Sequence, residues 1–358
     1  MLEVAFITDA PRVAGSEVWL RETLPLLLPL GIKPTVYLPA RPQLEPFSIQ
    51  LSHLGITTVL YRSLKELASE TEGYAIRILQ SWFPQTYATL LPSLRSPNAV
   101  FIHDQLEYHY PLGLTHLFRW VYGFTKAKYL RQATCLFVGT HWASLYLQRH
   151  FGLRAHVVPV GVDPNHFKPA TEEERRQLRR IYGFNRFTLI TPARFALEKN
   201  HISIAFTAKL VPEAEFLLIG EGDLARVIQS LSRVLKANNI RFLQSRLDVS
   251  ELYRASDAVL FPTLGDNPGL VILEGMASGL PVVTSPFPPQ KEVLSPSEGL
   301  LVPPTPSALA EAIRWLQDHP TESKIMGQKG RERILRERTN VHSAQTFVEA
   351  LHQCLNCG

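Results

Sequence analysis

The sequence predicts an α/β protein of two doubly wound domains, each built on a parallel β-sheet. Short runs of β-branched and apolar residues alternate with helix-length segments almost from end to end, which is typical of βαβ units. A turn-rich break from Gly161 to Pro169 interrupts this alternation near the middle of the 358 residues. Each half is long enough to bury a core of its own. We therefore expect domains at residues 1–163 and 164–340, with a helix over 341–358 packed back on the first domain.

The strand-like runs occur in two sets, one on each side of this break. In the first half they are Val4–Thr8, Thr35–Leu38, Thr57–Leu60, Ala75–Leu79, Ala99–Ile102, Cys135–Val138 and His156–Val158. In the second half they are Thr188–Thr191, Glu215–Ile219, Ile240–Leu243, Ala258–Phe261, Val282–Thr284 and Leu300–Val302. Between them the apolar spacing of three and four predicts helices, for example Leu309–Leu316. A charged helix is expected at Glu172–Arg180, after the break, and a last helical stretch at Val341–Cys354.

The composition is that of a globular protein without a membrane span. Apolar residues make up 45% of the chain and charged residues 19%. No apolar run reaches the ~18 residues that a bilayer span requires. A secretory leader is not expected, since the N-terminus opens on a strand-like run with no basic residues before it. The net charge of +5 permits an anionic partner without choosing between phosphate, lipid and nucleic acid.

The three cysteines are too few for a disulfide framework. Cys354 and Cys357 have the spacing of a redox or zinc-binding pair, but no second pair accompanies them. We interpret Cys135, Cys354 and Cys357 as incidental thiols and expect a reducing, cytoplasmic compartment.

The segment Asp266–Gly279 carries the clearest chemical signal. It follows a predicted strand, Pro268 suits the first turn of a helix, and Asp266 or Asn267 can serve as the N-cap. Gly269 permits a close approach of the backbone to a ligand. A helix N-terminus after a parallel strand offers N–H groups and a positive dipole end, which suit a phosphate.

Two carboxylates flank this helix start. Asp266 precedes the helix and Glu274 lies within it, roughly 10 Å further along the axis at about 1.5 Å per residue. Such a pair suits a ligand with hydroxyl groups at both ends of a diphosphate. The alternative is structural: Asp266 only caps the helix and Glu274 only faces solvent.

Basic residues and glycines follow two other strands of the second half. Arg194 offers a planar fork for phosphate oxygens and Lys199 a mobile point charge, both near the carboxyl end of Thr188–Thr191, where α/β proteins bind ligands. Gly220 and Gly222 form a glycine loop after the next strand. Each signal has a plain alternative, since Arg and Lys are common at helix starts and a glycine pair can be a tight turn.

In the order and spacing of these residues, the chain resembles the glycosyl transferases group 1 family of retaining enzymes. The family's donor-side pattern reads here Arg194-x4-Lys199, Gly220-x-Gly222, Asp266-x7-Glu274 and Ala277-Ser278-Gly279-Leu280-Pro281-Val282. The resemblance covers residues 155–320 and implies the GT-B fold, in which two Rossmann-like doubly wound domains face a central cleft. Asp266 stands where the family usually has Glu, and Val160 stands where its linker has Asn.

The resemblance implies a role for each of these positions. Arg194 and Lys199 would neutralise the departing diphosphate, Asp266 would hold sugar hydroxyls, and Glu274 would hold those of the ribose. The rest of the donor-binding set would be Gly15, Ser16, Gly220, Gly222, Asn267, Pro268, Gly269 and Leu270. The family generally needs no metal and no Asp-x-Asp motif occurs here, so we expect neither metal nor cofactor beside the nucleotide-diphosphate sugar.

Two features of the first half match the family more loosely. His103 follows the predicted strand Ala99–Ile102, where the family places a His close to the transferred sugar, and it could donate to a sugar hydroxyl. A surface-loop His is the alternative. Gly15 and Ser16 open a helix after the first strand, like the family's Gly-Gly-Ala-Glu turn, and could meet a phosphate or acceptor; a plain helix cap is the alternative.

A basic and aromatic stretch lies outside the family's pattern. From Tyr108 to Val162 the chain has no Asp or Glu. A helix that is rich in basic and aromatic residues, as this stretch is, can lie on an anionic membrane or hold an anionic acceptor. The alternative is an aromatic stripe that faces the core, with a solvated basic side. The candidate residues of this face are Arg119, Trp120, Lys126, Lys128 and Arg131.

The leading hypothesis is a retaining glycosyltransferase that moves a sugar from a UDP-, GDP- or ADP-sugar to a glycan or lipid-linked acceptor. We expect it in the cytoplasm or peripherally on the cytoplasmic face of an anionic membrane. A catalytically inactive GT-B subunit that binds a nucleotide sugar or a partner is the alternative. Nucleic acid is not expected as a partner, because no recognised nucleic-acid motif accompanies the basic charge.

Overall fold

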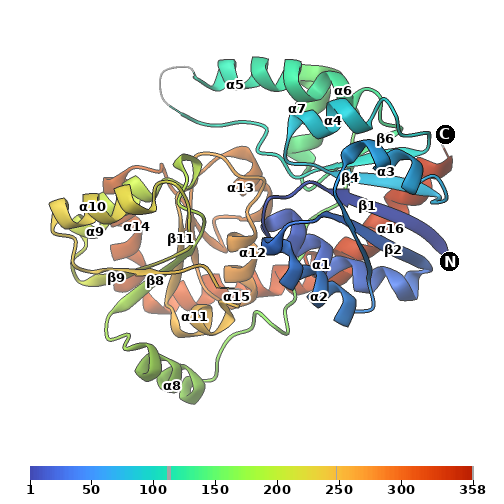
Figure 1. Ribbon diagram of the computed structural model, residues 1–358. Helices are drawn as coiled ribbons and strands as arrows, with labels where there is room; N and C mark the ends of the chain where they lie inside the picture. The colour runs from blue at the N-terminus through green and yellow to red at the C-terminus, as the bar shows by residue number, and fades with distance from the viewer. Residues whose placement is uncertain (111–113, 247, 357–358) are drawn as a thin grey trace. The chain divides into compact units, whose positions relative to one another are not determined.

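The computed structural model describes residues 1–110, 114–246 and 248–356, and the chain folds into two compact units (Figure 1). The first unit comprises Met1–Glu107, Pro111–Gly161 and Asn340–Gly358. The second comprises Tyr108–Tyr110 and Val162–Thr339. Tyr108–Tyr110 thus belongs to the second unit although its neighbours in the sequence belong to the first.

A seven-stranded parallel sheet forms the centre of the first unit. Its strand order is β3-β2-β1-β4-β5-β6-β7. The strands are β1 (Leu2–Thr8), β2 (Ile32–Pro39), β3 (Thr57–Tyr61), β4 (Ile76–Gln80), β5 (Asn98–Ile102), β6 (Cys135–Val138) and β7 (His156–Val157). Each lies where a β-branched run predicts it, so the expected doubly wound sheet is confirmed.

Helices cover both faces of this sheet. They are α1 (Gly15–Leu27), η1 (Leu28–Leu30), η2 (Pro42–Leu44), α2 (Glu45–His53), α3 (Leu64–Glu70), α4 (Pro84–Leu90), α5 (Leu114–Tyr122), η3 (Gly123–Ala127), α6 (Lys128–Leu130), α7 (His141–Phe151) and α16 (Asn340–Asn356). Successive side chains of a strand point to opposite faces. The ring of Phe6 therefore meets Trp19 of α1 and Phe347 of α16, at 6.3 and 5.8 Å. Its neighbour Ile7 belongs to the core on the other face, together with Leu90 of α4.

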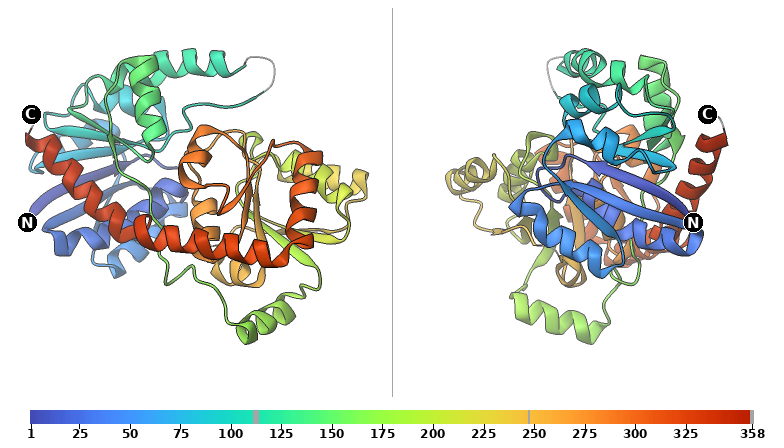
Figure 2. Two further views of the ribbon diagram at one scale, coloured as in Figure 1. Left: turned by 180° about the vertical axis from the view of Figure 1, so that it is seen from behind. Right: turned by 45° about the vertical axis from the view of Figure 1, so that its right-hand side comes forward.

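The C-terminal helix α16 lies against α1 of the first unit (Figure 2). Trp19 Nε1 donates to the Ser343 hydroxyl at 3.1 Å, and the Trp19 ring packs edge-on against Phe347 at 5.6 Å. These contacts are buried, so α16 closes the first core although more than three hundred residues separate it from α1 in the sequence.

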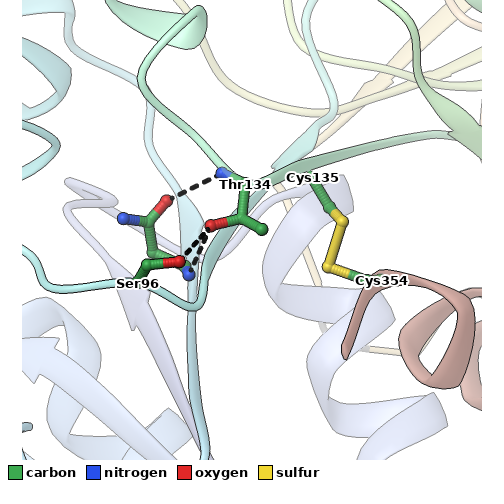
Figure 3. Close-up of a disulfide and its surroundings, with 5 residues drawn as sticks. Ser96, Thr134, Cys135 and Cys354 are labelled. Carbon is green, nitrogen blue, oxygen red and sulfur yellow. Dashed lines mark hydrogen bonds between the residues drawn. A yellow bond between two sulfur atoms is a disulfide. The ribbon is translucent and has the colours of Figure 1, made fainter. Parts of the chain in front are cut away.

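A disulfide joins Cys135 of β6 to Cys354 of α16, beside the hydrogen bond between the hydroxyls of Thr134 and Ser96 (Figure 3). The Cα atoms are 5.9 Å apart and both cysteines are buried. This bond corrects the interpretation of the two residues as incidental thiols; Cys357 lies outside the described residues. Because disulfides persist in oxidising compartments, the cysteines no longer support a reducing, cytoplasmic location.

The second unit contains a six-stranded parallel sheet in the order β10-β9-β8-β11-β12-β13. Its strands are β8 (Phe187–Pro192), β9 (Ala214–Ile219), β10 (Ile240–Leu243), β11 (Ala258–Phe261), β12 (Val282–Thr284) and β13 (Gly299–Leu301), again at the predicted runs. The strand order reverses between β8 and β11. In open α/β sheets, ligands bind beyond the carboxyl ends of the strands at such a switch point. The loops that start there, residues 193–196 and 262–269, therefore carry the candidate site.

The helices of the second unit also lie on both faces of its sheet. They are α8 (Glu172–Tyr182), η4 (Leu197–Lys199), α9 (His201–Leu210), α10 (Ala225–Leu235), α11 (Ser250–Ala255), α12 (Leu270–Ala277), α13 (Pro288–Val293), α14 (Pro306–Asp318) and α15 (Pro320–Glu337). Local chemistry sets their ends: Thr171 caps α8 by accepting from Glu174 N–H, and Gly183 ends it in the left-handed conformation. Within the described ranges, no helix is both long and apolar enough to cross a bilayer.

Candidate functional site

The centre of the candidate site is an ion pair at the switch point of the second sheet. Lys199, the last residue of η4, donates to the carboxylate of Asp266 in the loop after β11. Only 12% and 15% of the two side chains are exposed, and the ammonium lies 5.5 Å from the centre of the Phe261 ring. Opposite charges attract strongly where water is largely excluded, so each side chain fixes the other. The sequence places both residues in the site but does not show that they touch.

Arg194 is held by a second acidic residue. Its Nη2 donates to Glu198 Oε1 at 2.6 Å, while 43% of the Arg194 side chain stays exposed and accessible to an anion. The main-chain carbonyl of Glu198 accepts from Leu264 N–H at 2.6 Å and from the Thr263 hydroxyl at 2.9 Å. Glu198 therefore ties the loop after β8 to the loop after β11. Sequence reasoning missed it, because an acidic residue between two cations carries no signal for an anion site.

The glycine loop after β9 packs directly on the segment that carries Arg194. A Cβ atom at Gly220 would lie 2.3 Å from the carbonyl oxygen of Ala193, and one at Gly222 would lie 2.5 Å from that of Phe195. Both glycines also have positive φ angles, 154° and 150°. The two glycines allow this close backbone contact and so position the Arg194 loop.

Helix α12 begins at Leu270, later than the sequence predicts. Pro268 precedes the helix, joined to Asn267 by a cis peptide bond, and Gly269 occupies the N-cap with a φ of 105°. The carboxylate of Asp266 accepts from Asn267 N–H at 3.1 Å and does not cap the helix. The expected places of Pro268 in the first turn and of Asp266 or Asn267 at the N-cap are therefore wrong. The physical reason is the loop conformation, which requires a glycine just before the helix.

Contacts from two directions fix this loop. A Cβ atom at Gly269 would lie 2.8 Å from the Phe261 ring and 3.2 Å from the Asp266 carboxylate, so glycine lets that carboxylate lie against the helix start. From the other side, the buried Gln290 of α13 donates to the carbonyls of Asp266 and Pro268 at 3.2 and 2.9 Å. Gln290 was not a candidate, since a lone Gln in a short helix matches no ligand pattern.

The segment Tyr108–Tyr110 adds a third support. His109 donates its backbone N–H to the Leu264 carbonyl at 2.7 Å. Its ring stacks on Phe287, which immediately precedes α13, with the ring centroids 3.7 Å apart. Nothing in the sequence indicates that residues from the first half of the chain brace a loop of the second unit.

Glu274 is oriented by a buried tyrosine. Tyr253 of α11 donates its hydroxyl to Glu274 Oε2 at 2.7 Å. Burial, and then the nearby carboxylate, raises the pKa of Tyr253 well above its ordinary value of 10, so the hydroxyl keeps its proton. At the adjacent Gly275 a Cβ atom would lie 2.4 Å from the Val259 side chain, so glycine lets α12 approach β11 closely. Glu274 is thus half-buried and hydrogen-bonded rather than a purely solvated position.

His201 is a buried residue beside this site that the sequence did not single out. Its ring packs on Phe195 at 4.4 Å, and only 2% of the residue is exposed. Burial, followed by the charge of Lys199, lowers the pKa of His201 to about 3, so the ring is neutral at physiological pH. Among the described residues, neither ring nitrogen has a hydrogen-bond partner.

His103 lies in the first unit, just after β5. Its ring stacks on Phe101 at 4.3 Å and lies 6.1 Å from Trp19, so it is not a surface-loop residue. Burial lowers the pKa of His103 to about 3. Nε2 has no hydrogen-bond partner among the described residues. The imidazole is therefore neutral and able to donate to or accept from a hydroxyl, which fits a polar contact and not a charged one.

Helix α1 begins at Gly15, as predicted. The Ser16 hydroxyl donates to Glu17 at 2.8 Å and accepts from Trp82 Nε1 at 3.1 Å, while Glu17 also accepts from Ala14 N–H at 3.2 Å. These bonds tie Ser16 into the start of the helix, which favours the helix-cap alternative. Burial raises the pKa of Glu17 to about 7, against the lowering effect of its hydrogen bonds.

The five candidate residues of the basic stretch do not form one basic face. Arg119 pairs with Glu107 at 2.8 Å and Lys126 with Asp104 at 2.6 Å, so both charges are directed into the first unit. Both acidic partners precede the acid-free stretch, so the composition of that stretch alone does not reveal these ion pairs. The other candidates are exposed: Trp120, Lys128 and Arg131.

Comparisons with solved structures identify the fold class. HepE from Anabaena, solved in complex with UDP and glucose, is 19% identical and superposes with a TM-score of 0.84, over 98% of this chain and all of that one. Sucrose-phosphate synthase from Thermosynechococcus elongatus is 18% identical, with a TM-score of 0.83 and full coverage of both chains. Two parallel-sheet Rossmann-like units and these neighbours define the GT-B fold, as the sequence predicts.

Sequence comparison finds a similarity that lies within the second unit. Residues 174–333, which contain the whole ion-pair site, match the family described as glycosyl transferases group 1. EpsD of Bacillus subtilis is 29% identical over 53% of this chain, and the chain spans about half its length, 52%. The D-rhamnosyltransferase WbpZ of Pseudomonas aeruginosa is 22% identical over 80% of this chain and 74% of its own.

Proposed function

We propose that this protein is a glycosyltransferase that moves a sugar from a nucleotide-diphosphate sugar to a glycan or lipid-linked acceptor, with retention of configuration and without a metal or cofactor. The observation that carries the proposal is the Lys199–Asp266 pair at the switch point of the second sheet, beside Arg194. HepE, whose fold this chain shares, was solved with UDP and with UDP-glucose. A relative from Corynebacterium glutamicum is a GDP-mannose-dependent mannosyltransferase that acts on a phosphatidylinositol mannoside. UDP-, GDP- and ADP-sugars are therefore the donors to test.

The basic residues would stabilise the leaving group. Arg194 and Lys199 lie at the carboxyl end of β8, where a diphosphate would accept hydrogen bonds from both. Lys199 has three N–H donors and gives one to Asp266, so it can serve a phosphate and the carboxylate together. Charge that develops on the diphosphate during bond cleavage would then be met by cations already in position.

The loop before α12 would hold the sugar. Asp266 would accept from sugar hydroxyls, and its contacts with Lys199 and with Asn267 N–H keep the carboxylate oriented. The N–H groups at the start of α12, from Gly269 and Leu270, would face the sugar and the distal phosphate. Glu274, oriented by Tyr253, would accept from the ribose hydroxyls.

The proposed chemistry is a front-face displacement. The bond from the anomeric carbon to the phosphate oxygen breaks, and the bond to the acceptor oxygen forms on the same face. The acceptor hydroxyl passes its proton to the departing phosphate, so no protein carboxylate has to act as nucleophile. His103, neutral in this structure, would contribute a hydrogen bond to a sugar hydroxyl.

A non-catalytic nucleotide-sugar-binding or partner subunit is the second candidate. It is favoured by Asp266, whose side chain is one methylene shorter than the family's usual Glu and is held by Lys199. An ion pair of this kind could bind a donor without promoting transfer.

Transfer and hydrolysis from a panel of labelled UDP-, GDP- and ADP-sugars separate the two candidates. We expect release of nucleoside diphosphate by the wild-type protein and its loss in Lys199→Ala and Glu274→Ala. NMR of the product should show the donor's anomeric configuration, and an inverted product overturns the front-face mechanism. Donor binding without turnover by the wild-type protein supports the non-catalytic candidate. A place of work in the cytoplasm or on the cytoplasmic face of a membrane is proposed from the need for a nucleotide sugar alone, because the Cys135–Cys354 disulfide does not support it.

A further inference from the structure

Helix α5 and the turn that follows it carry their charged side toward the protein. Arg119 Nη2 lies 2.8 Å from Glu107, the Tyr122 hydroxyl donates to Asp104 at 3.2 Å, and Lys126 Nζ lies 2.6 Å from Asp104. These three residues recur at spacings of three and four, so they share one side of the helix. That side is the one packed on the first unit.

The opposite side of the same helix is apolar and faces outward. None of the nine residues of α5, all of them described, is buried. Trp120 is 62% exposed and its ring packs on that of Phe124, which is 58% exposed, at 4.7 Å. The large apolar side chains exposed by 40% or more over this stretch are Leu114, Leu117, Phe118, Trp120, Val121 and Phe124. An ordinary surface helix has the reverse arrangement, with its apolar stripe toward the core.

The ion pairs prevent the helix from turning its apolar side inward. Only 10% of the Lys126 side chain and 20% of the Asp104 side chain are exposed. Rotating the helix about its axis would leave the Asp104 carboxylate without its cation at a largely buried position, which is strongly unfavourable. The apolar side is therefore held outward, and a contiguous patch of this kind marks a surface that contacts an apolar partner.

The charges around the patch select among partners. Lys128 and Arg131 follow the patch directly and are exposed, and residues 114–162 contain no Asp or Glu. A second copy of this chain, docked through the same patch, would bring like charges together. Anionic phospholipids supply both an apolar layer and negative headgroups, and aromatic side chains favour that interface.

We propose that α5 docks this protein on the surface of an anionic membrane, parallel to the bilayer plane. Trp120 and Phe124 enter the interface between headgroups and acyl chains. Lys128 and Arg131 contact lipid phosphates. The contact differs from one made by a basic face, because Arg119 and Lys126 are engaged in internal ion pairs.

Vesicle flotation of the full chain tests this proposal without reference to any catalytic activity. The wild-type protein should float with vesicles of phosphatidylcholine and phosphatidylglycerol at low salt, and less with phosphatidylcholine alone. Trp120→Ser with Phe124→Ser should lower the partition coefficient at least about tenfold, since each removes a large apolar side chain from the interface. The matched control is Val227→Ser with Val234→Ser on α10, which removes two apolar side chains exposed by 54% and 79% and should change nothing.

Further variants separate the contributions and guard against misfolding. Lys128→Glu with Arg131→Glu should abolish the preference for anionic vesicles. If the first pair unfolds, Leu117→Ser with Val121→Ser tests the same patch at exposed positions.

Failure of the wild-type protein to float at low salt overturns the proposal. So does equal flotation of the wild-type protein and the α5 variants. A wild-type dimer in sedimentation velocity that the α5 variants convert to monomer, without vesicle binding, assigns the patch to self-association and also overturns it.

Discussion

Breaking the Lys199–Asp266 pair from one side gives the sharpest prediction for stability. In Lys199→Met the side chain keeps its length and its contact with Phe261 but loses the charge that neutralises Asp266. Removing one partner of a buried ion pair costs about 3–5 kcal/mol, because it leaves an uncompensated charge. Since 12% and 15% of these side chains are exposed, water relieves part of the cost, and we expect the lower end, about 3 kcal/mol. At 2–4 °C per kcal/mol, the melting temperature should fall by roughly 6–12 °C.

The double variant Lys199→Met with Asp266→Asn distinguishes this explanation from a loss of packing. Without either charge, no carboxylate is left unpaired, so most of the lost stability should return. Activity should not return, because the cation that meets the diphosphate is still missing, and a loss of at least about 100-fold in kcat is expected for both variants. Thermal and urea unfolding followed by circular dichroism, together with donor turnover, measure both effects. An unchanged melting temperature in Lys199→Met, or no recovery in the double variant, refutes the reasoning.

Three further predictions follow from other contacts. Burial raises the pKa of Glu17 from 4.5 to about 7, so the folded protein holds this proton more tightly than the unfolded chain, and stability falls as the pH rises from about 4.5 to 7 and levels off above that. Glu17→Gln should flatten the fall in melting temperature between pH 5 and 7, and an unchanged slope would contradict it. Reduction of the Cys135–Cys354 disulfide should cost about 2–4 kcal/mol of folding stability and so lower the melting temperature in dithiothreitol. A Cys354→Ser variant should show the same lower melting temperature without reductant, and equal melting of the wild-type protein with and without reductant would count against the prediction. His109→Ala should raise KM for the nucleotide sugar up to about tenfold, whereas His109→Phe, which keeps the ring stack on Phe287, should have the KM of the wild-type protein. Equal KM values in the two variants would exclude a role for the ring.

The strands of both sheets could be predicted because their signal is local. A buried parallel strand needs a short run of β-branched and apolar residues, and Val4–Thr8 and Ala258–Phe261 are runs of this kind that form β1 and β11. The start of α12 was mispredicted because tertiary contacts decide it. Gln290 holds the carbonyls before the helix, and the positive φ of Gly269 turns the chain into it.

The remaining corrections also concern partners that are distant in sequence. The basic stretch looked free of acidic residues, yet Arg119 and Lys126 reach Glu107 and Asp104, which precede it. Cys135 and Cys354 are 219 positions apart, and only the packing of α16 on the first unit brings them together. Residue types at the site were predictable from spacing, whereas their pairing was not.

The central claim is that the ion pair at the switch point of the second sheet binds a nucleoside diphosphate. Calorimetric titration of the wild-type protein with UDP, GDP and ADP tests it most directly, with melting temperature as a second readout. We predict that one of them binds and, at one hundred times its Kd, stabilises the fold by about 2.7 kcal/mol. Lys199→Ala and Glu274→Ala should weaken this binding. If none of the three nucleotides binds the wild-type protein or raises its melting temperature, the claim is wrong.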